Sequence, residues 1–187
     1  MRRRRTSTLV AGALAAMATA IGCRDVLAPT PKDPGTPRLH VAEGPADFRL
    51  TGGGRTDQRD HVGFEKNTPE SRDFATFGFQ ARPVGPGTTE GSGNITWVEH
   101  NPDALGGGFT FHGRVTRFER TDSDCGQFSG TGRAHLRDGT VLDADFLVEH
   151  ACDVDEPGRG ADHIAMILPG YERHGLLSGG NIQKHRL

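Results

Sequence analysis

The sequence predicts an all-β domain over residues 47–187, folded as an antiparallel barrel or a two-sheet sandwich of about eight strands. Three observations favour this class. Glycine is abundant, at 27 of 187 residues, which suits a turn-rich β protein. No window shows a sustained 3.6-residue apolar period, so no long helix is expected. Short stretches of alternating apolar and polar residues recur instead, between turns rich in Gly and Pro.

Residues 1–22 have the features of a signal peptide for export. Four arginines at residues 2–5 precede an apolar run at 9–21, which is too short to span a bilayer comfortably. The stretch Ala-Ile-Gly-Cys at 20–23 resembles the bacterial lipoprotein box. That resemblance implies that lipid, including palmitate, is attached to Cys23 and that the chain is cut just before it. The alternative is an ordinary cleaved signal with a chance cysteine.

Cleavage before Cys23 would leave 165 residues, with 18 Lys and Arg against 24 Asp and Glu and a formal net charge of −6. This charge disfavours a nucleic-acid partner, and the length suits one domain with its own core. Arg24, rather than Asp, follows the cysteine. By resemblance to lipoprotein sorting in bacteria with two membranes, this implies the outer membrane. We therefore expect a cell-envelope protein that contacts the membrane through an N-terminal lipid.

Residues 23–46 predict an extended tether, because prolines recur there among Gly and polar residues without an apolar period. In the first half of the domain, Phe48 and Leu50 predict a strand that runs into a glycine loop at residues 52–54. Further along, strands are predicted at 74–81 and 95–99, with a Gly/Pro loop at 83–93 between them.

From residue 109 the alternation becomes regular. Residues 109–116 predict a half-buried antiparallel strand, and Phe118 falls out of its phase, which indicates a bulge or the end of the strand.

The next two strands, predicted at 128–136 and 142–148, form a hairpin around the sequence Arg-Asp-Gly at 137–139. A two-residue turn would place the apolar faces on opposite sides, whereas a three-residue loop with a left-handed Gly139 aligns them. The resulting pairs are Ala134 with Leu142, Phe128 with Val148, and Gly130 with Phe146.

Cys125 and Cys152 then arrive at the same end of the hairpin, one residue out of true opposition. A small bulge or fraying near Gly126 would bring their Cα atoms within the ~7 Å that a disulfide needs. An exported chain enters an oxidising compartment, so we expect the two cysteines to be paired. Two free thiols or a metal-binding pair are the alternatives, although the spacing matches no zinc ribbon.

The loops beside these cysteines carry concentrated negative charge. The candidate metal ligands are Asp122, Asp124, Asp153, Asp155 and Glu156, with Asp162 a little further on. Oxygen-rich loops of this kind suit Ca²⁺, although the EF-hand spacing is absent. The alternative, which we favour, is a pair of solvated acidic loops without any cofactor.

The histidines are scattered along the chain rather than spaced as ligand pairs on one element. His150 and His163 are the two that could approach each other across neighbouring strands, and a metal site built from them is disfavoured because no two histidines are spaced as a ligand pair on one element. No Gly-x-Ser-x-Gly elbow, phosphate-binding loop or dinucleotide fingerprint is present.

The last two strands are predicted at 163–168 and 175–184, with Pro-Gly-Tyr at 169–171 as the turn between them and a bulge or close backbone approach at the Gly-Gly of 179–180. The end of the chain carries three motifs in succession: Glu-Pro-Gly at 156–158, Asp162, and Gly-x-Leu-x-Gly-Gly-Asn-Ile-Gln-x-His at 175–185. Together they resemble the C-terminal signature of a group of uncharacterised bacterial secreted and lipoprotein β-domains. That group usually has Asn-Gly before Glu-Pro-Gly, and Val-Asp stands there in this chain. The resemblance implies an extracytoplasmic β-domain and adds no catalytic residues.

These observations predict a lipid-anchored cell-envelope domain with a binding or structural role toward an envelope protein or a ligand. Two other classes stay open. One is an envelope enzyme with a His/Asp or metal site assembled from distant strands. The other is a barrel that carries a small apolar ligand.

Overall fold

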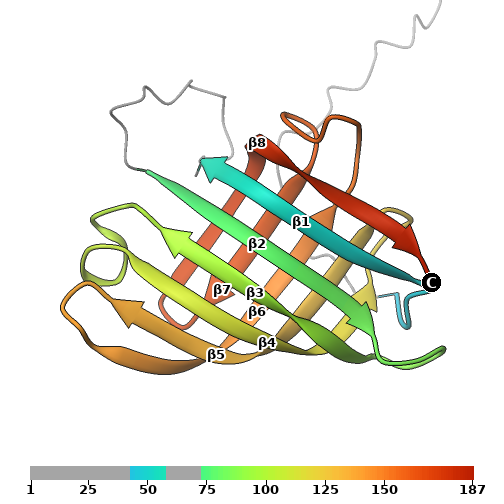
Figure 1. Ribbon diagram of the computed structural model, residues 1–187, viewed down its shortest axis with the longest axis horizontal. Coiled ribbons are helices and arrows are strands. Elements are labelled where there is room, and N and C mark those ends of the chain that lie inside the picture. Colours follow the sequence, from blue (N-terminus) through green and yellow to red (C-terminus); the bar gives the residue numbers. More distant parts are fainter. Residues whose placement is uncertain (1–42, 58–72) are drawn as a thin grey trace, which may run out of the picture. The chain divides into compact units, whose positions relative to one another are not determined.

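The structure is a computed structural model that describes residues 43–57 and 73–187 of the chain. Its eight strands form a closed antiparallel barrel in which each strand pairs with the next and β8 pairs with β1 (Figure 1). The all-β antiparallel prediction is confirmed, and the fold is a barrel rather than a sandwich. The strands are β1 Phe48–Asp57, β2 Phe74–Pro83, β3 Glu90–Glu99, β4 Phe109–Arg120, β5 Cys125–Leu136, β6 Val141–Cys152, β7 His163–Leu168 and β8 Tyr171–Arg186.

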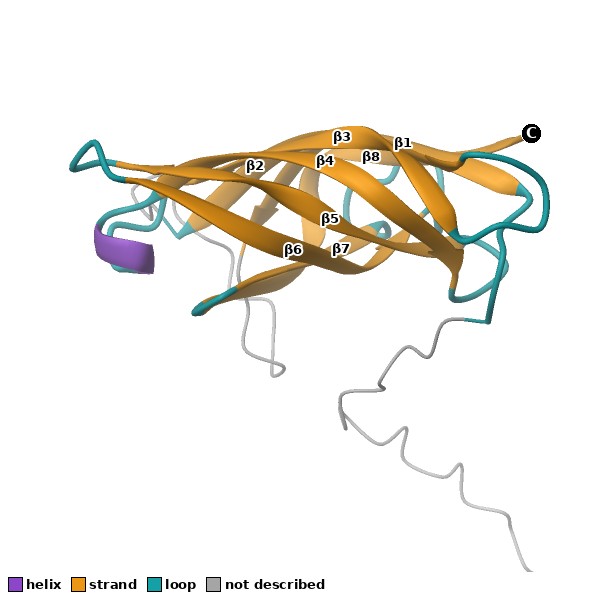
Figure 2. Cartoon of the chain, turned by 90° about the horizontal axis from the view of Figure 1, so that it is seen from below, coloured by secondary structure: helices purple, strands orange, loops and turns teal. Residues whose placement is uncertain are grey.

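The two ends of the barrel differ in what they carry. One end, which we call the cysteine end, holds the start of β1, the loops β2–β3, β4–β5 and β6–β7, and both cysteines. The opposite end holds the β3–β4, β5–β6 and β7–β8 connections. In the described part of the chain, the one helical element is the short 3-10 helix η1, Ala104–Gly106, in the β3–β4 connection (Figure 2).

Aromatic side chains fill the barrel interior, because the inward position recurs every second residue on each strand. The ring of Phe77 stacks on that of Trp97 with centroids 5.7 Å apart. The rings of Phe79 and Phe128 lie 5.0 Å apart, and those of Phe111 and Phe146 lie 5.5 Å apart. An eight-stranded barrel is just wide enough for side chains to fill it, and this interior is packed in that way.

The hairpin of β5 and β6 has the register that the sequence predicts. Ala134 lies opposite Leu142, Phe128 opposite Val148 and Gly130 opposite Phe146. Gly139 has φ +88°, the left-handed conformation that the three-residue loop requires. The predicted irregularity near Phe118 is also present, as a register shift between Val115 and Arg117 on β4.

Two glycine-rich stretches that we predicted as loops are parts of strands. β1 continues through residues 52–54, and β3 begins at Glu90, so the loop between β2 and β3 is confined to residues 84–89. At Gly52 the glycine is required by close packing and not by a turn, because a Cβ there would stand 2.7 Å from the ring of Phe79. The bare backbone there makes room for an aromatic ring inside the barrel.

β8 also starts earlier than predicted, at Tyr171 rather than at residue 175, so the turn is confined to Pro169 and Gly170. Tyr171 and Arg173 alternate inward, ahead of Gly175 and Leu177. The close backbone approach predicted at the glycine pair is present, because a Cβ on Gly180 would collide with the backbone oxygen of Gly53.

The chain enters the barrel at the cysteine end. The backbone N–H of Glu43 donates to the carbonyl of Arg120 at 2.7 Å, and Ala46 is buried. Residues 43–46, which we assigned to the tether, therefore contact the barrel. The predicted signal peptide, Cys23 and the tether up to residue 42 lie outside the described residues.

Candidate functional site

The two cysteines predicted to pair lie directly opposite each other on β5 and β6. The sulfur atoms of Cys125 and Cys152 are 2.06 Å apart, at disulfide-bond distance, and both residues are buried. A register shift between Gly126 and Phe128 removes the one-residue offset that the hairpin would otherwise leave. This is the bulge near Gly126 that the pairing required.

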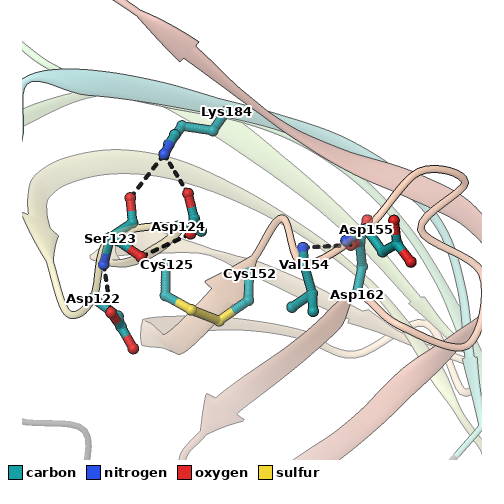
Figure 3. The surroundings of a disulfide bond; sticks show 9 residues. All are labelled: Asp122, Ser123, Asp124, Cys125, Cys152, Val154, Asp155, Asp162 and Lys184. Carbon is teal, nitrogen blue, oxygen red and sulfur yellow. Dashed lines mark hydrogen bonds and ion pairs between the residues drawn. A yellow bond between two sulfur atoms is a disulfide. The ribbon is translucent and has the colours of Figure 1, made fainter.

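The pairing brings the two acidic loops into contact. The backbone N–H of Asp153 donates to the carbonyl of Asp124 at 3.0 Å. The ammonium group of Lys184 lies over the first loop, where it donates to the carboxylate of Asp124 and, at 2.9 Å, to the carbonyl of Ser123 (Figure 3). The hydrogen bond from Lys184 lowers the pKa of Asp124, and a second hydrogen bond from the Ser123 hydroxyl lowers it further. A lysine from β8 thus compensates this carboxylate.

The carboxylates of the second loop bind mainly to backbone amides. Asp162 is fully buried, and its Oδ1 accepts from the N–H of Val154 at 2.9 Å while its Oδ2 accepts from the N–H of Ile182 at 2.7 Å. Asp153 accepts from the backbone N–H of Lys184 at 2.7 Å. These hydrogen bonds hold the β6–β7 loop against β8, so the carboxylates of Asp153 and Asp162 have a structural role.

The residues of the C-terminal signature contact one another in the same place. Both carboxylate oxygens of Glu156 accept from the Asn181 side-chain amide at 3.0 Å. The Asn181 Oδ1 in turn accepts from the backbone N–H of Gly158 at 2.8 Å. A Cβ on Gly158 would collide with Asp162 and Asn181, so only glycine fits. The signature therefore describes how this loop is held on β8.

Asp122, Asp155 and Glu156 are the exposed members of the predicted metal set. Asp122 bonds to the backbone N–H of Ser123, and Asp155 bonds to that of Glu156 at 2.8 Å. Within the described ranges, no group of three or more His, Cys, Asp or Glu side chains is placed to hold a metal ion. Calcium binding at these loops stays a prediction that needs a solution test.

The most concentrated buried charge lies elsewhere, near the opposite end of the barrel. Glu99 on β3 and Arg173 on β8 are both inside, with side chains 0% exposed. The carboxylate of Glu99 accepts from Arg173 Nε at 2.7 Å, from Arg173 Nη2 at 2.9 Å and from the backbone N–H of Asn101 at 2.8 Å. The Tyr171 hydroxyl donates a further short hydrogen bond to it. Four donors leave this carboxylate with little capacity for another partner.

Further hydrogen bonds extend the cluster of Glu99, Tyr171 and Arg173 to Trp97 and to Asp73. The indole N–H of Trp97 donates to the Tyr171 hydroxyl at 2.9 Å, and Arg173 Nη2 donates to the half-exposed Asp73 at 2.8 Å. Burial raises the pKa of Tyr171, and the charge of Glu99 raises it further. Burial opposes the charge of Arg173, but hydrogen bonds to Glu99 and Asp73 outweigh it and the pKa of Arg173 is raised.

Sequence reasoning missed this buried pair, although a signal was present. Alternation from Ile95 through Trp97 places Glu99 on the inward face of β3. The same period places Arg173 inward between Tyr171 and Leu177. Two opposite charges on inward positions of different strands predict an internal ion pair.

The prediction that His150 and His163 approach each other is confirmed. Their ring centroids lie 4.7 Å apart, and that of His174 on β8 lies 6.2 Å from His150. His174 also bonds to the carboxylate of Glu172. The three residues come from β6, β7 and β8, and His174 directly follows Arg173 on β8.

No protein-family model, curated protein or solved structure matches the chain. In the part of the chain that the structure describes, no helix is long and apolar enough to cross a membrane.

Proposed function

We propose that this chain is a lipid-anchored cell-envelope protein whose barrel serves as a rigid binding module. The observation that carries the proposal is the juxtaposition of Cys125 and Cys152 across the end of the β5–β6 hairpin. Disulfides persist in oxidising compartments and are rare in the cytosol. The arginine-rich, apolar and cysteine-ended segment at 1–23 supports export on independent grounds.

The barrel interior supports a binding or structural role rather than catalysis. Inside the barrel the aromatic rings pack on one another, and the buried Glu99 pairs with Arg173. A general base needs a carboxylate with a free lone pair within reach of substrate, and that of Glu99 is occupied by four donors. Surfaces and loops are therefore the parts available to a partner.

The point where the chain enters the barrel supports an orientation in which the cysteine end is nearest the proposed anchor. Residue 43 joins the barrel at the cysteine end, and the 19 residues 24–42 lie between it and Cys23. A Pro-rich segment of this length reaches at most about 60 Å at ~3.1 Å per residue. The barrel would then lie within this distance of the membrane, and Arg24 favours the outer membrane.

The test of the anchor is metabolic labelling of the full chain with palmitate. Wild-type protein should incorporate label, and Cys23→Ser should accumulate as an unlabelled precursor. Cys125→Ser is the matched control, because it removes a cysteine without touching the lipidation site. A wild-type chain that takes up no label would overturn the lipoprotein proposal.

A metal-dependent envelope enzyme is the second candidate, and one observation favours it. The rings of His150, His163 and His174 lie near one another on three strands, although no three such side chains of the described residues are placed to hold a metal ion. Zinc that copurifies with the protein together with a hydrolytic activity would support it. A carrier of small apolar ligands has less support, because aromatic rings occupy the interior. Retention of bound lipid after purification would restore it.

A further inference from the structure

A groove of about 250 Å³ crosses the outer face of β1, β2 and β3 near the cysteine end. Its polar lining consists of Arg49, Thr51, Gln80, Arg82 and Ser92. β8, β1, β2 and β3 run side by side across this wall (Figure 1). The groove is therefore built on paired strands, which fix the spacing of its side chains.

Polar and cationic side chains like those of the groove continue across the outer face of five strands. In one row, Gln183, Thr51, Gln80, Asn94 and Arg114 are successive cross-strand neighbours. In the adjacent row, His185 lies opposite Arg49, and Arg82 lies opposite Ser92. We call these two rows the arginine–amide face. Its two rows hold guanidinium, amide, hydroxyl and imidazole groups, and the carboxylate of Glu156 lies at its β8 edge, where it accepts from the Gln183 side-chain amide at 3.3 Å.

The arginines of this face differ from several others on the barrel surface, which are paired with carboxylates. Arg133 pairs with Asp143 at 3.1 Å, and Arg117 pairs with Glu119 at 2.7 Å. No ion pair joins Arg49, Arg82 or Arg114 to any carboxylate of the described residues. Their charges are available to a ligand.

The charge is unevenly distributed around the barrel. The outer positions of β6 carry Asp143, Asp145 and Glu149, whereas the arginine–amide face is cationic although the chain as a whole has a formal charge of −2. Asp47 and Glu90 border the face at its cysteine end, each two residues before a residue of the groove. A cationic face on an acidic protein selects anionic partners through local contacts rather than through net charge.

We propose that the arginine–amide face binds a carboxylate-bearing polysaccharide. Guanidinium groups match the planar carboxylates of uronic acids with paired hydrogen bonds. The amides of Gln80 and Asn94 and the hydroxyls of Thr51 and Ser92 supply both donors and acceptors for sugar hydroxyls. Apart from His185, whose ring is hydrogen-bonded to Thr51 at 2.9 Å, the two rows hold no aromatic side chain on which nucleobases would stack, and no apolar residue that would take an acyl chain. The proposal names a partner class for the binding role proposed above.

The test measures binding of polygalacturonate to the full chain purified in detergent. Arg49→Gln with Arg82→Gln should weaken binding by at least about tenfold, because two charge-assisted contacts are lost. Arg133→Gln with Arg137→Gln is the matched control, since it removes the same charge from another part of the surface. Gln80→Ala keeps the charge and should weaken binding about threefold or more, through a lost hydrogen bond.

Neutral dextran and a single-stranded oligothymidylate complete the set of probes. Dextran should bind much more weakly than polygalacturonate, and so should oligothymidylate at the same salt concentration. Equal binding of wild type and Arg49→Gln/Arg82→Gln, an equal loss in the control, a preference for oligothymidylate or no binding of polygalacturonate would each overturn the proposal. The palmitate experiment is separate: its failure removes the anchor and leaves this face unaffected.

Discussion

The buried pair of Glu99 and Arg173 predicts a specific pattern in mutant stabilities. Glu99→Leu would leave the guanidinium of Arg173 inside the barrel with only the half-exposed Asp73 as a charged partner. Removing one member of a buried ion pair typically costs about 3–5 kcal/mol. A domain of this size has about 5–15 kcal/mol of stability in total. The loss should therefore be a large fraction of the free energy of unfolding.

The double variant Glu99→Leu/Arg173→Met should lose less than either single variant. Replacing both charges with apolar side chains removes the uncompensated charge, and such replacements are often neutral or stabilising by about 1–4 kcal/mol. Because Trp97 is the sole tryptophan of the chain and lies within this cluster, its fluorescence reports unfolding in urea. Glu90→Gln on the exposed surface is the control and should change stability by less than about 0.5 kcal/mol. A loss below about 1 kcal/mol in Glu99→Leu, or losses that simply add in the double variant, would refute the reasoning.

Three further predictions concern the remaining chemistry. Replacing Cys125 and Cys152 with serine should cost roughly 3–4 kcal/mol by the chain-entropy estimate, and intact mass with and without alkylation in the unreduced protein should show no free thiol at these positions. The melting temperature should be the same in millimolar Ca²⁺ and in chelator, because Lys184 and backbone amides already bind the acidic loops; a bound ion at a hundred times Kd would instead add about 2.7 kcal/mol. The raised pKa of Tyr171 means that stability is complete below about pH 10 and falls as pH rises above it, by up to about 1.4 kcal/mol per unit. Tyrosinate absorbance of this sole tyrosine should appear only together with unfolding, and a midpoint near 10 in the folded protein would contradict the assignment.

The sequence was most informative where local chemistry determines structure. The β5–β6 register followed from Gly139 and from the need to keep Phe128 and Phe146 on one face, and the structure has that register. The bulge beside Gly126 followed from the position of the cysteines. These features depend on residues within one hairpin, so that periodicity and turn type were enough to find them.

Features that depend on distant strands were missed. Gly52 lies in a strand because the ring of Phe79 from β2 occupies the space beside it, and no local rule distinguishes such a glycine from a loop glycine. Arg173 is inside because Glu99, 74 positions earlier in the chain, faces it. Lys184 compensates Asp124 across 60 positions. Each needs the closed barrel before the two partners can be recognised.

The closure of the barrel by β1 and β8 has a consequence for how the chain acquires its fold. Phe48 pairs with Arg186, so the last contacts join residues separated by almost the whole domain. Until β8 has been synthesised, β1 and β7 are both open sheet edges, and unpaired edges promote association between chains. Contacts of such long sequence separation also form slowly. The nascent domain is therefore most vulnerable to aggregation in the interval before its final strand arrives, and any variant that delays β8 lengthens that interval.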